Sequence, residues 1–221
     1  SYFWREVTAE SNDNYQGAHG RILKSGLAAF LEEGFEKANL RRICKAAGVT
    51  TGAFYKHFKD KEALFSELVE PLASMIRKAY AQGEKRGFAG YDEGKPVTPE
   101  QVRAALEAKA AGTLATTAML YSHRDIYELL VFRSYGTPYE HFLDWLVDEE
   151  DRTTLRVLEL IHGAEKARTV ISKESLHIVN HAFYSALSEN IIHAKSVEEL
   201  NATTEVISTF FNAGWEKYRT L

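Results

Sequence analysis

The sequence predicts an all-α protein. Apolar side chains recur at helical spacing along most of the 221 residues, and no run of alternating β-branched residues indicates a strand. Signals for helix starts also recur, as in Thr98-Pro99 and Thr137-Pro138, where a capping residue precedes proline. The single cysteine, Cys44, excludes an intramolecular disulfide, and a chain of this length can bury a sizeable core without one.

The N-terminal part predicts three helices that form a helix-turn-helix domain. The first is expected over 13–33, with Gly34 as a left-handed C-cap. Two short helices, over 40–47 and 51–57, should be joined by a sharp turn at Gly48, where glycine permits a positive φ. Two short helices joined in this way are typical of a DNA-reading motif.

The remaining chain predicts a larger helical body. Asp60 can cap a helix over 60–85, which Pro71 should bend, and a loop rich in glycine follows. Further helices are expected over 99–120, 123–134, 138–167, 173–194 and 197–218. We therefore divide the chain into a polar N-terminal extension at 1–12, a helix-turn-helix domain at 13–60, and a helical regulatory and dimerisation domain at 61–221.

The charge distribution favours a polyanionic partner at one end of the chain. The net charge of −4 alone argues mildly against nucleic acid. However, residues 21–61 carry nine basic and four acidic side chains, a local charge of +5, which leaves −9 on the rest. A basic module on an acidic body suits DNA. A chance fluctuation of charge is the alternative.

The cations and polar groups of the two short helices fall on their outer faces. Arg41, Arg42 and Lys45 lie outside on the helix over 40–47 and could meet phosphates. The outer face of the next helix presents Thr51, Gly52, Tyr55 and Lys56. Lys61 opposes the helix dipole in the first turn of its helix, which indicates an external anion, unless Asp60 or Glu62 neutralises it.

Four consecutive segments resemble the N-terminal domain of TetR/AcrR regulators. They are residues 30–35 (FLEEGF), 40–49 (LRRICKAAGV), 52–58 (GAFYKHF) and 59–65 (KDKEALF), and the likeness extends over about 15–70. The family usually has alanine where Cys44 stands. The resemblance implies a three-helix DNA reader, followed by an all-helical regulatory domain, in a homodimer on a palindromic operator.

The resemblance also implies which residues contact DNA. Arg41, Thr51, Gly52 and Tyr55 would lie against the duplex. Thr50 would cap the third helix, while Tyr55, His57 and Lys61 would touch phosphate. Because Gly52 has no side chain, sequence reading should depend on Arg41 and Thr51. With Lys56 from the outer face, the expected DNA-binding residues are Arg41, Thr50, Thr51, Gly52, Tyr55, Lys56, His57 and Lys61.

The last two helices predict a dimer interface. The helix over 197–218 carries two apolar stripes, one for its own core and one that a second copy could bury, although burial within one chain is the alternative. The resemblance favours dimerisation through the helices over 173–194 and 197–218. The interface residues we expect are Phe183, Leu187, Ile191, Ile207, Phe211 and Trp215.

An aromatic-rich stretch between 119 and 145 could bind a small, partly apolar effector. In the family a pocket forms among these middle helices, although aromatic residues at helical spacing are often simply core. The candidate effector-binding residues are Met119, His123, Tyr127, Arg133, Phe142 and Trp145.

The sequence offers little support for an enzyme. His177 and His181 share a helix face, as do Glu189 and His193, which permits a metal site, but no third ligand follows from the spacing. We favour polar contacts for these residues and expect no metal and no cofactor. Phosphate-binding glycine loops, nucleophile elbows and metalloprotease signatures are also missing from the sequence.

The most economical function is a repressor that a small-molecule effector releases from its operator. The alternatives are a DNA-binding module controlled by a protein partner and an all-helical metal-dependent enzyme that uses the region of His177, His181 and Glu189. With no apolar run near the roughly 20 residues of a membrane helix, we expect no membrane association and a cytoplasmic location.

Overall fold

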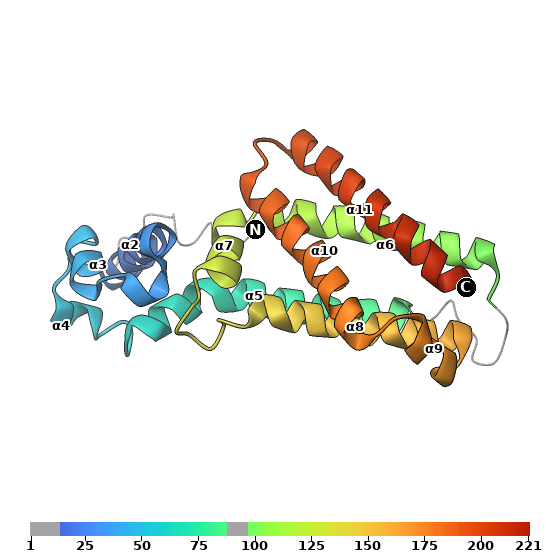
Figure 1. Cartoon of the computed structure of the whole chain (residues 1–221). Helices are drawn as coiled ribbons and strands as arrows, with labels where there is room; N and C mark the ends of the chain where they lie inside the picture. Colours follow the sequence, from blue (N-terminus) through green and yellow to red (C-terminus); the bar gives the residue numbers. More distant parts are fainter. Residues whose placement is uncertain (1–13, 88–96) are drawn as a thin grey trace. The chain divides into compact units, whose positions relative to one another are not determined.

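The computed structural model describes residues 14–87 and 97–221. Over these residues the chain forms α-helices and no strand, which confirms the predicted all-α class (Figure 1). The predicted extension at 1–12 and the glycine-rich loop after Gly87 lie outside the described residues. No helix in the described part of the chain is both long and apolar enough to cross a membrane.

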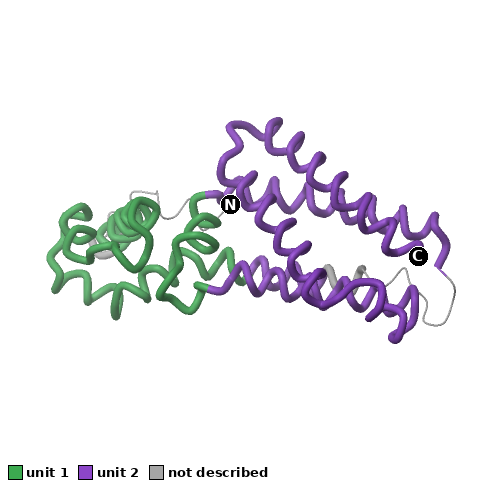
Figure 2. The backbone as a smooth tube through the Cα atoms, viewed as in Figure 1, with its two compact units in different colours: residues 1–74, 125–140 green, residues 75–124, 141–221 purple. Residues whose placement is uncertain are grey.

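The chain divides into two compact units (Figure 2). Unit 1 comprises residues 1–74 and 125–140, and unit 2 comprises residues 75–124 and 141–221. Unit 1 holds α2 (Asn14–Lys37), α3 (Leu40–Ala46), α4 (Thr51–Phe54), the first part of α5 (Lys61–Gly87) and α7 (Arg124–Phe132). Unit 2 holds the rest of α5, α6 (Pro99–Tyr121), α8 (Phe142–His162), α9 (Ala164–Val170), α10 (Lys173–His193) and α11 (Val197–Thr220).

An aromatic cluster forms the centre of unit 1. The ring of Phe65 in α5 lies 5.2 Å from that of Phe30 and 5.3 Å from that of Phe35, both edge to face. Close approach of α2 and α5 requires glycine at position 26, because a Cβ there would lie 2.8 Å from Leu64 Cδ2. These contacts fix the first helix of the predicted DNA reader on the start of α5.

Gly34 interrupts α2 where the sequence predicted a cap. Its φ is 75° and its ψ is 163°, so the conformation is positive in φ but extended rather than left-handed helical. The chain therefore turns at Gly34, and the amide of Phe35 donates to the carbonyl of Arg133 at 2.9 Å. This bond joins the turn to the residue that follows α7 within unit 1.

Unit 2 has its own apolar core. The side chains of Val102 and Leu106 on α6 pack with Leu176 on α10 and Trp215 on α11. Each of the four is buried, which is the pattern expected of helices that share one apolar centre.

One predicted helix, over 138–167, is wrong. Thr137 and Pro138 form part of a turn instead, in which the Thr137 hydroxyl donates to the Ser134 carbonyl at 2.6 Å and accepts from the Tyr139 amide at 3.1 Å. The helix, α8, begins only at Phe142. It ends at His162, and Gly163, with a φ of 81°, separates it from α9.

Candidate DNA-binding surface

A side-chain cap fixes the start of α3. Oδ1 of Asn39 accepts hydrogen bonds from the amides of Arg41 at 2.9 Å and Arg42 at 3.2 Å. Asparagine is among the best N-caps because it satisfies amides that have no partner within the helix. Asn39 was not among the predicted caps, although an asparagine directly before an apolar helical pattern is a start signal.

The turn and the second short helix follow the predicted chemistry. Gly48 has a φ of 67°, in the region that favours glycine. The Thr50 hydroxyl accepts from the Ala53 amide at 3.1 Å, which confirms the predicted cap. Only Thr51–Phe54 is helical, so α4 is shorter than the expected 51–57, and a tight turn continues to His57.

The inner faces of these two helices are apolar. The buried side chains are Ile43, Cys44, Ala47, Phe54 and Phe58. Burial raises the pKa of the Cys44 thiol, and a hydrogen bond with Thr51 opposes part of this effect. Thr51 is half-buried and therefore faces α3 in part, rather than only the outside as expected.

The outer faces leave a short, polar and cationic surface. Arg41, Lys45, Gly52, Tyr55 and Lys56 are exposed, with Tyr55 exposed to 56%. The side chains of Arg41 and Lys45 make no hydrogen bond or ion pair with any residue that the structure describes. Such groups can meet phosphates or base edges without first losing a partner within the protein.

Two other arginines near this surface are occupied within the protein. Arg42 forms ion pairs with Glu33 and, at 2.6 Å, with Glu32. Nε of Arg21 donates to the Ala47 carbonyl at 3.0 Å and so joins α2 to the end of α3. Arg42 lies on the outer face as expected, but it already has partners within the protein, and its contact with phosphate stays a prediction.

Lys61 has a different role from the one predicted. Its Nζ donates to the carbonyls of Phe35 at 2.6 Å, Glu36 at 3.1 Å and Ala38 at 3.1 Å. An ammonium group has three N–H donors, so these bonds use all of them. Burial lowers the pKa of Lys61, and the nearby charge of Glu36 opposes this effect. Neither an external anion nor Asp60 or Glu62 is needed to explain the cation.

His57 lies beside the exposed surface and is half-buried. Its ring centroid is 5.6 Å from that of His19, which in turn stacks on Phe58 at 4.8 Å. Burial lowers the pKa of His57, and the charges of His19 and Lys56 lower it further. Each of these effects favours the neutral imidazole in the chain without DNA.

The six expected effector residues do not form one group in either unit. Tyr127 and Arg133 belong to unit 1, whereas Met119, His123, Phe142 and Trp145 belong to unit 2. Within unit 2, the rings of Phe142 and Trp145 lie 5.4 Å apart. A groove of about 580 Å³ in unit 2 lies between α6 and α11, and none of the six lines it.

The apolar stripe that we expected at a dimer interface is mostly core of unit 2. Phe183, Leu187, Ile191 and Trp215 are buried within the single chain, and Ile207 and Phe211 are half-buried. Phe183 and Phe211 pack edge to face at 5.2 Å. Four of the six expected interface residues thus contribute to the core of their own chain, while a dimer contact through Ile207 and Phe211 stays a prediction.

A different apolar set is exposed on the same two helices. Ile178 on α10 is exposed to 67%, and Val206 and Phe210 on α11 are exposed to 69% and 76%. We call these three residues the open face of α10 and α11. Exposed aromatic and β-branched side chains on adjoining helices are typical of surfaces that another protein covers.

Comparisons with known proteins find relatives for the N-terminal part of the chain. The family described as "Bacterial regulatory proteins, tetR family" matches residues 22–68. The chain is 49% identical over 70 residues to the HTH-type transcriptional regulator AcrR of Shigella flexneri, covering 32% of this chain and 33% of that protein. It is 31% identical over 91 residues to the HTH-type transcriptional repressor Rv1474c of Mycobacterium tuberculosis, covering 41% and 47%.

The chain thus matches only a third to a half of the length of these curated relatives. Among solved structures, NalD, the secondary repressor of the MexAB-OprM efflux pump in Pseudomonas aeruginosa, aligns with 89% of this chain and 95% of its own at 20% identity. Its TM-score is 0.47, too low a likeness to carry an argument. The likeness to the tetR family of bacterial regulatory proteins is thus a likeness of residues 22–68.

Proposed function

We propose that the chain is a DNA-binding transcription regulator that acts as a repressor on a palindromic operator. The observation that carries the proposal is the outer face of α3 and α4, where Arg41, Lys45 and Tyr55 are exposed on a short, capped helix pair. A major groove admits such a helix, and the flanking cations suit phosphates. Its place of action would be the cytoplasm, where bacterial DNA lies.

The DNA contacts that we propose are narrower than the sequence suggested. Arg41 and Thr51 would read bases, and the backbone at Gly52 would lie close to the duplex. The residues that would meet phosphate are Lys45, Tyr55, Lys56 and His57. Thr50 would act mainly as the cap of α4. We leave Lys61 out, because its ammonium group is bonded to three carbonyls.

The working unit would be a homodimer. Two readers occupy successive major grooves only when they are about 34 to 36 Å apart, or a multiple of that distance. The open face of α10 and α11, with Phe210 exposed to 76%, is the surface that a second copy would cover.

A small-molecule effector in the helical body would release the operator. α5 contributes residues to both units, and Pro71 removes one amide hydrogen bond from it three residues before unit 1 ends at Ser74. An effector that moves α5 would change the distance between the helix-turn-helix domains of the two protomers. The coupling free energy between an effector site and a second binding site is typically about 1 to 3 kcal/mol.

The test is operator selection from random duplex DNA, followed by fluorescence anisotropy with the selected sequence. The double variant Arg41→Ala/Lys45→Ala should bind at least about tenfold more weakly, because both cations would contact DNA. Lys173→Ala is the matched control, since Lys173 is an exposed cation on α10 in unit 2, and it should bind as the wild type does. Failure to enrich any sequence at low salt would refute the proposal.

A further inference from the structure

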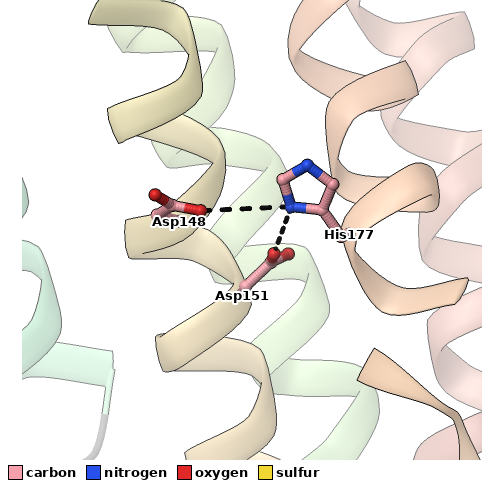
Figure 3. A group of neighbouring side chains, drawn as sticks. All are labelled: Asp148, Asp151 and His177. Carbon is pink, nitrogen blue, oxygen red and sulfur yellow. Dashed lines mark hydrogen bonds and ion pairs between the residues drawn. The ribbon is translucent and has the colours of Figure 1, made fainter. Parts of the chain in front are cut away.

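Three side chains that commonly bind metals meet in unit 2 (Figure 3). Asp148 and Asp151 lie on α8, one helical turn apart, and His177 lies on α10. One ligand atom from each residue lies within 4.8 Å of the other two. Nδ1 of His177 is 2.8 Å from Oδ2 of Asp151 and 4.0 Å from Oδ1 of Asp148.

The spacing of these atoms suits a small divalent cation. When a metal ion lies about 2.0 to 2.2 Å from each ligand in tetrahedral geometry, the ligand atoms are roughly 3.2 to 3.6 Å apart. The two measured separations, 2.8 Å and 4.0 Å, bracket that range. The Asp148 side chain is exposed to 72%, so it can rotate by the small amount required.

A buried residue holds Asp151 in the orientation that a ligand needs. Nδ2 of Asn180, which is only 1% exposed, donates to Oδ1 of Asp151 at 2.7 Å. This bond directs the other oxygen, Oδ2, toward His177. Metal-binding carboxylates are commonly oriented by such an outer hydrogen bond, and its removal typically weakens metal binding.

The charges of the three groups suit a divalent cation. The imidazole of His177 is the group that the structure brings against both carboxylates. A divalent cation would balance the negative charges of the two carboxylates, and the imidazole would supply a nitrogen ligand.

We propose that Asp148, Asp151 and His177 bind a divalent transition-metal ion of the Zn²⁺ type that joins α8 to α10. One nitrogen and two carboxylate ligands suit Zn²⁺ or Co²⁺, whereas Mg²⁺ prefers oxygen ligands alone. Three protein ligands leave a fourth position for water or for His181, whose ring centroid is 6.3 Å from that of His177. The site does not depend on the proposed DNA binding.

The sequence pointed to only half of this site. The spacing of His177 and His181 on one helix indicated candidate ligands, but no third ligand followed from the spacing. The carboxylates come from α8, and Asp151 precedes His177 by 26 residues, a separation that no local motif defines.

The test uses the full chain after treatment with a chelator. Addition of Zn²⁺ at about 100 times its dissociation constant should raise Tm by about 5 to 10 °C. Co²⁺ should give visible absorption bands that Zn²⁺ abolishes. Asp148→Asn should lose most of the Tm rise and of the Co²⁺ absorption, and because Asp148 is exposed, this variant should fold normally.

Two further variants make the result decisive. Asp151→Asn should also lose the metal response. His193→Ala should keep it, because His193 pairs only with Glu189 on the same helix, at 3.1 Å, and no second helix supplies a ligand in the part of the chain that the structure describes. The proposal is overturned if Zn²⁺ leaves Tm unchanged, if Mg²⁺ stabilises the chain equally, or if Asp148→Asn responds as the wild type does.

Discussion

Lys109 of α6 and Glu150 of α8 form an ion pair in which the carboxylate is buried. Tyr184 donates its hydroxyl hydrogen to Oε2 of Glu150 at 3.1 Å, and the Tyr80 hydroxyl is hydrogen-bonded to that of Tyr184. Burial acts to raise the pKa of Glu150, but the charge and hydrogen bond of Lys109, with help from Tyr184 and Arg219, lower it overall. Three helices of unit 2 are thus joined through one carboxylate.

The first prediction concerns the loss of the cation from this pair. Lys109→Met would leave Glu150 charged and buried without its main partner, which should reduce the free energy of unfolding by about 3 to 5 kcal/mol. Urea unfolding at pH 7 measures this loss. The double variant Lys109→Met/Glu150→Gln should recover much of it, and an equally unstable double variant would contradict the electrostatic explanation.

The same pair predicts a pH dependence. Because the folded pKa of Glu150 is below its usual value of 4.5, its stabilisation is present above the unfolded pKa and is lost as pH falls through the folded pKa. In Lys109→Met, burial without the cation should raise the pKa of Glu150 above its usual value, so protonation of Glu150 as the pH falls should relieve part of the destabilisation instead of adding to it. Urea midpoints measured between pH 3 and pH 7 test this, and identical profiles for both proteins would count against it.

The second prediction concerns Lys61. Lys61→Met should lower the free energy of unfolding by about 1 to 3 kcal/mol, because three carbonyls at the end of α2 lose a charged donor. The change also removes a cation that lies 4.4 Å from the centre of the Phe35 ring. Lys59→Met, at an exposed neighbour, serves as the control and should change stability little. A loss of operator affinity in folded Lys61→Met would restore the phosphate contact that the sequence suggested.

Lys61 and Arg42 illustrate what sequence reasoning could and could not predict here. Local rules correctly gave the all-α class, the glycine turn at Gly48 and the cap at Thr50, because each depends on residues within a few positions of one another. The partners of Lys61 and Arg42 lie on α2 and directly after it, outside the helix that carries either cation. No periodicity or motif specifies such contacts, so both cations looked available for DNA.

The sequence could not predict which apolar stripe lies in the core and which on the surface, because this also depends on contacts between different helices. The sequence showed that α11 has two stripes, but not which one faces α6 and α10. Packing around Trp215 decides this, because it turns the stripe of Phe211 inward and leaves Phe210 outside. The break at Gly163 was missed because a single glycine within a helical pattern is compatible with a continuous helix.

The third prediction separates two neighbouring arginines. Arg41→Ala should lose about 1 to 3 kcal/mol of operator binding and relax the preference at one position, if the exposed guanidinium reads a base. Arg42→Ala should bind the operator normally and lose only about 0 to 1 kcal/mol of stability, because its ion pairs with Glu32 and Glu33 are largely exposed. Anisotropy against a panel of single-base operator variants measures both. An equal loss on every operator would make Arg41 a phosphate contact instead.

The fourth prediction concerns the open face of α10 and α11. Phe210→Asp places a charge on a side chain that is exposed to 76% in the single chain, so each protomer should keep its helical content, as measured by circular dichroism. A charge buried without a partner in a dimer contact is strongly unfavourable, so the variant should sediment as a monomer. Operator affinity should fall at the same time, because a monomer presents only one reader.

Phe183 provides the matched control for Phe210, since it is also an aromatic residue of these two helices but is buried within the chain. Phe183→Ala should lower the free energy of unfolding by about 3 to 5 kcal/mol, because a core cavity is created, whereas Phe210→Asp should not create one. If Phe210→Asp remained dimeric in sedimentation equilibrium, the contact between protomers would have to lie elsewhere. The open face would then be a candidate site for a different protein. Control by a protein partner is the alternative that the sequence allowed.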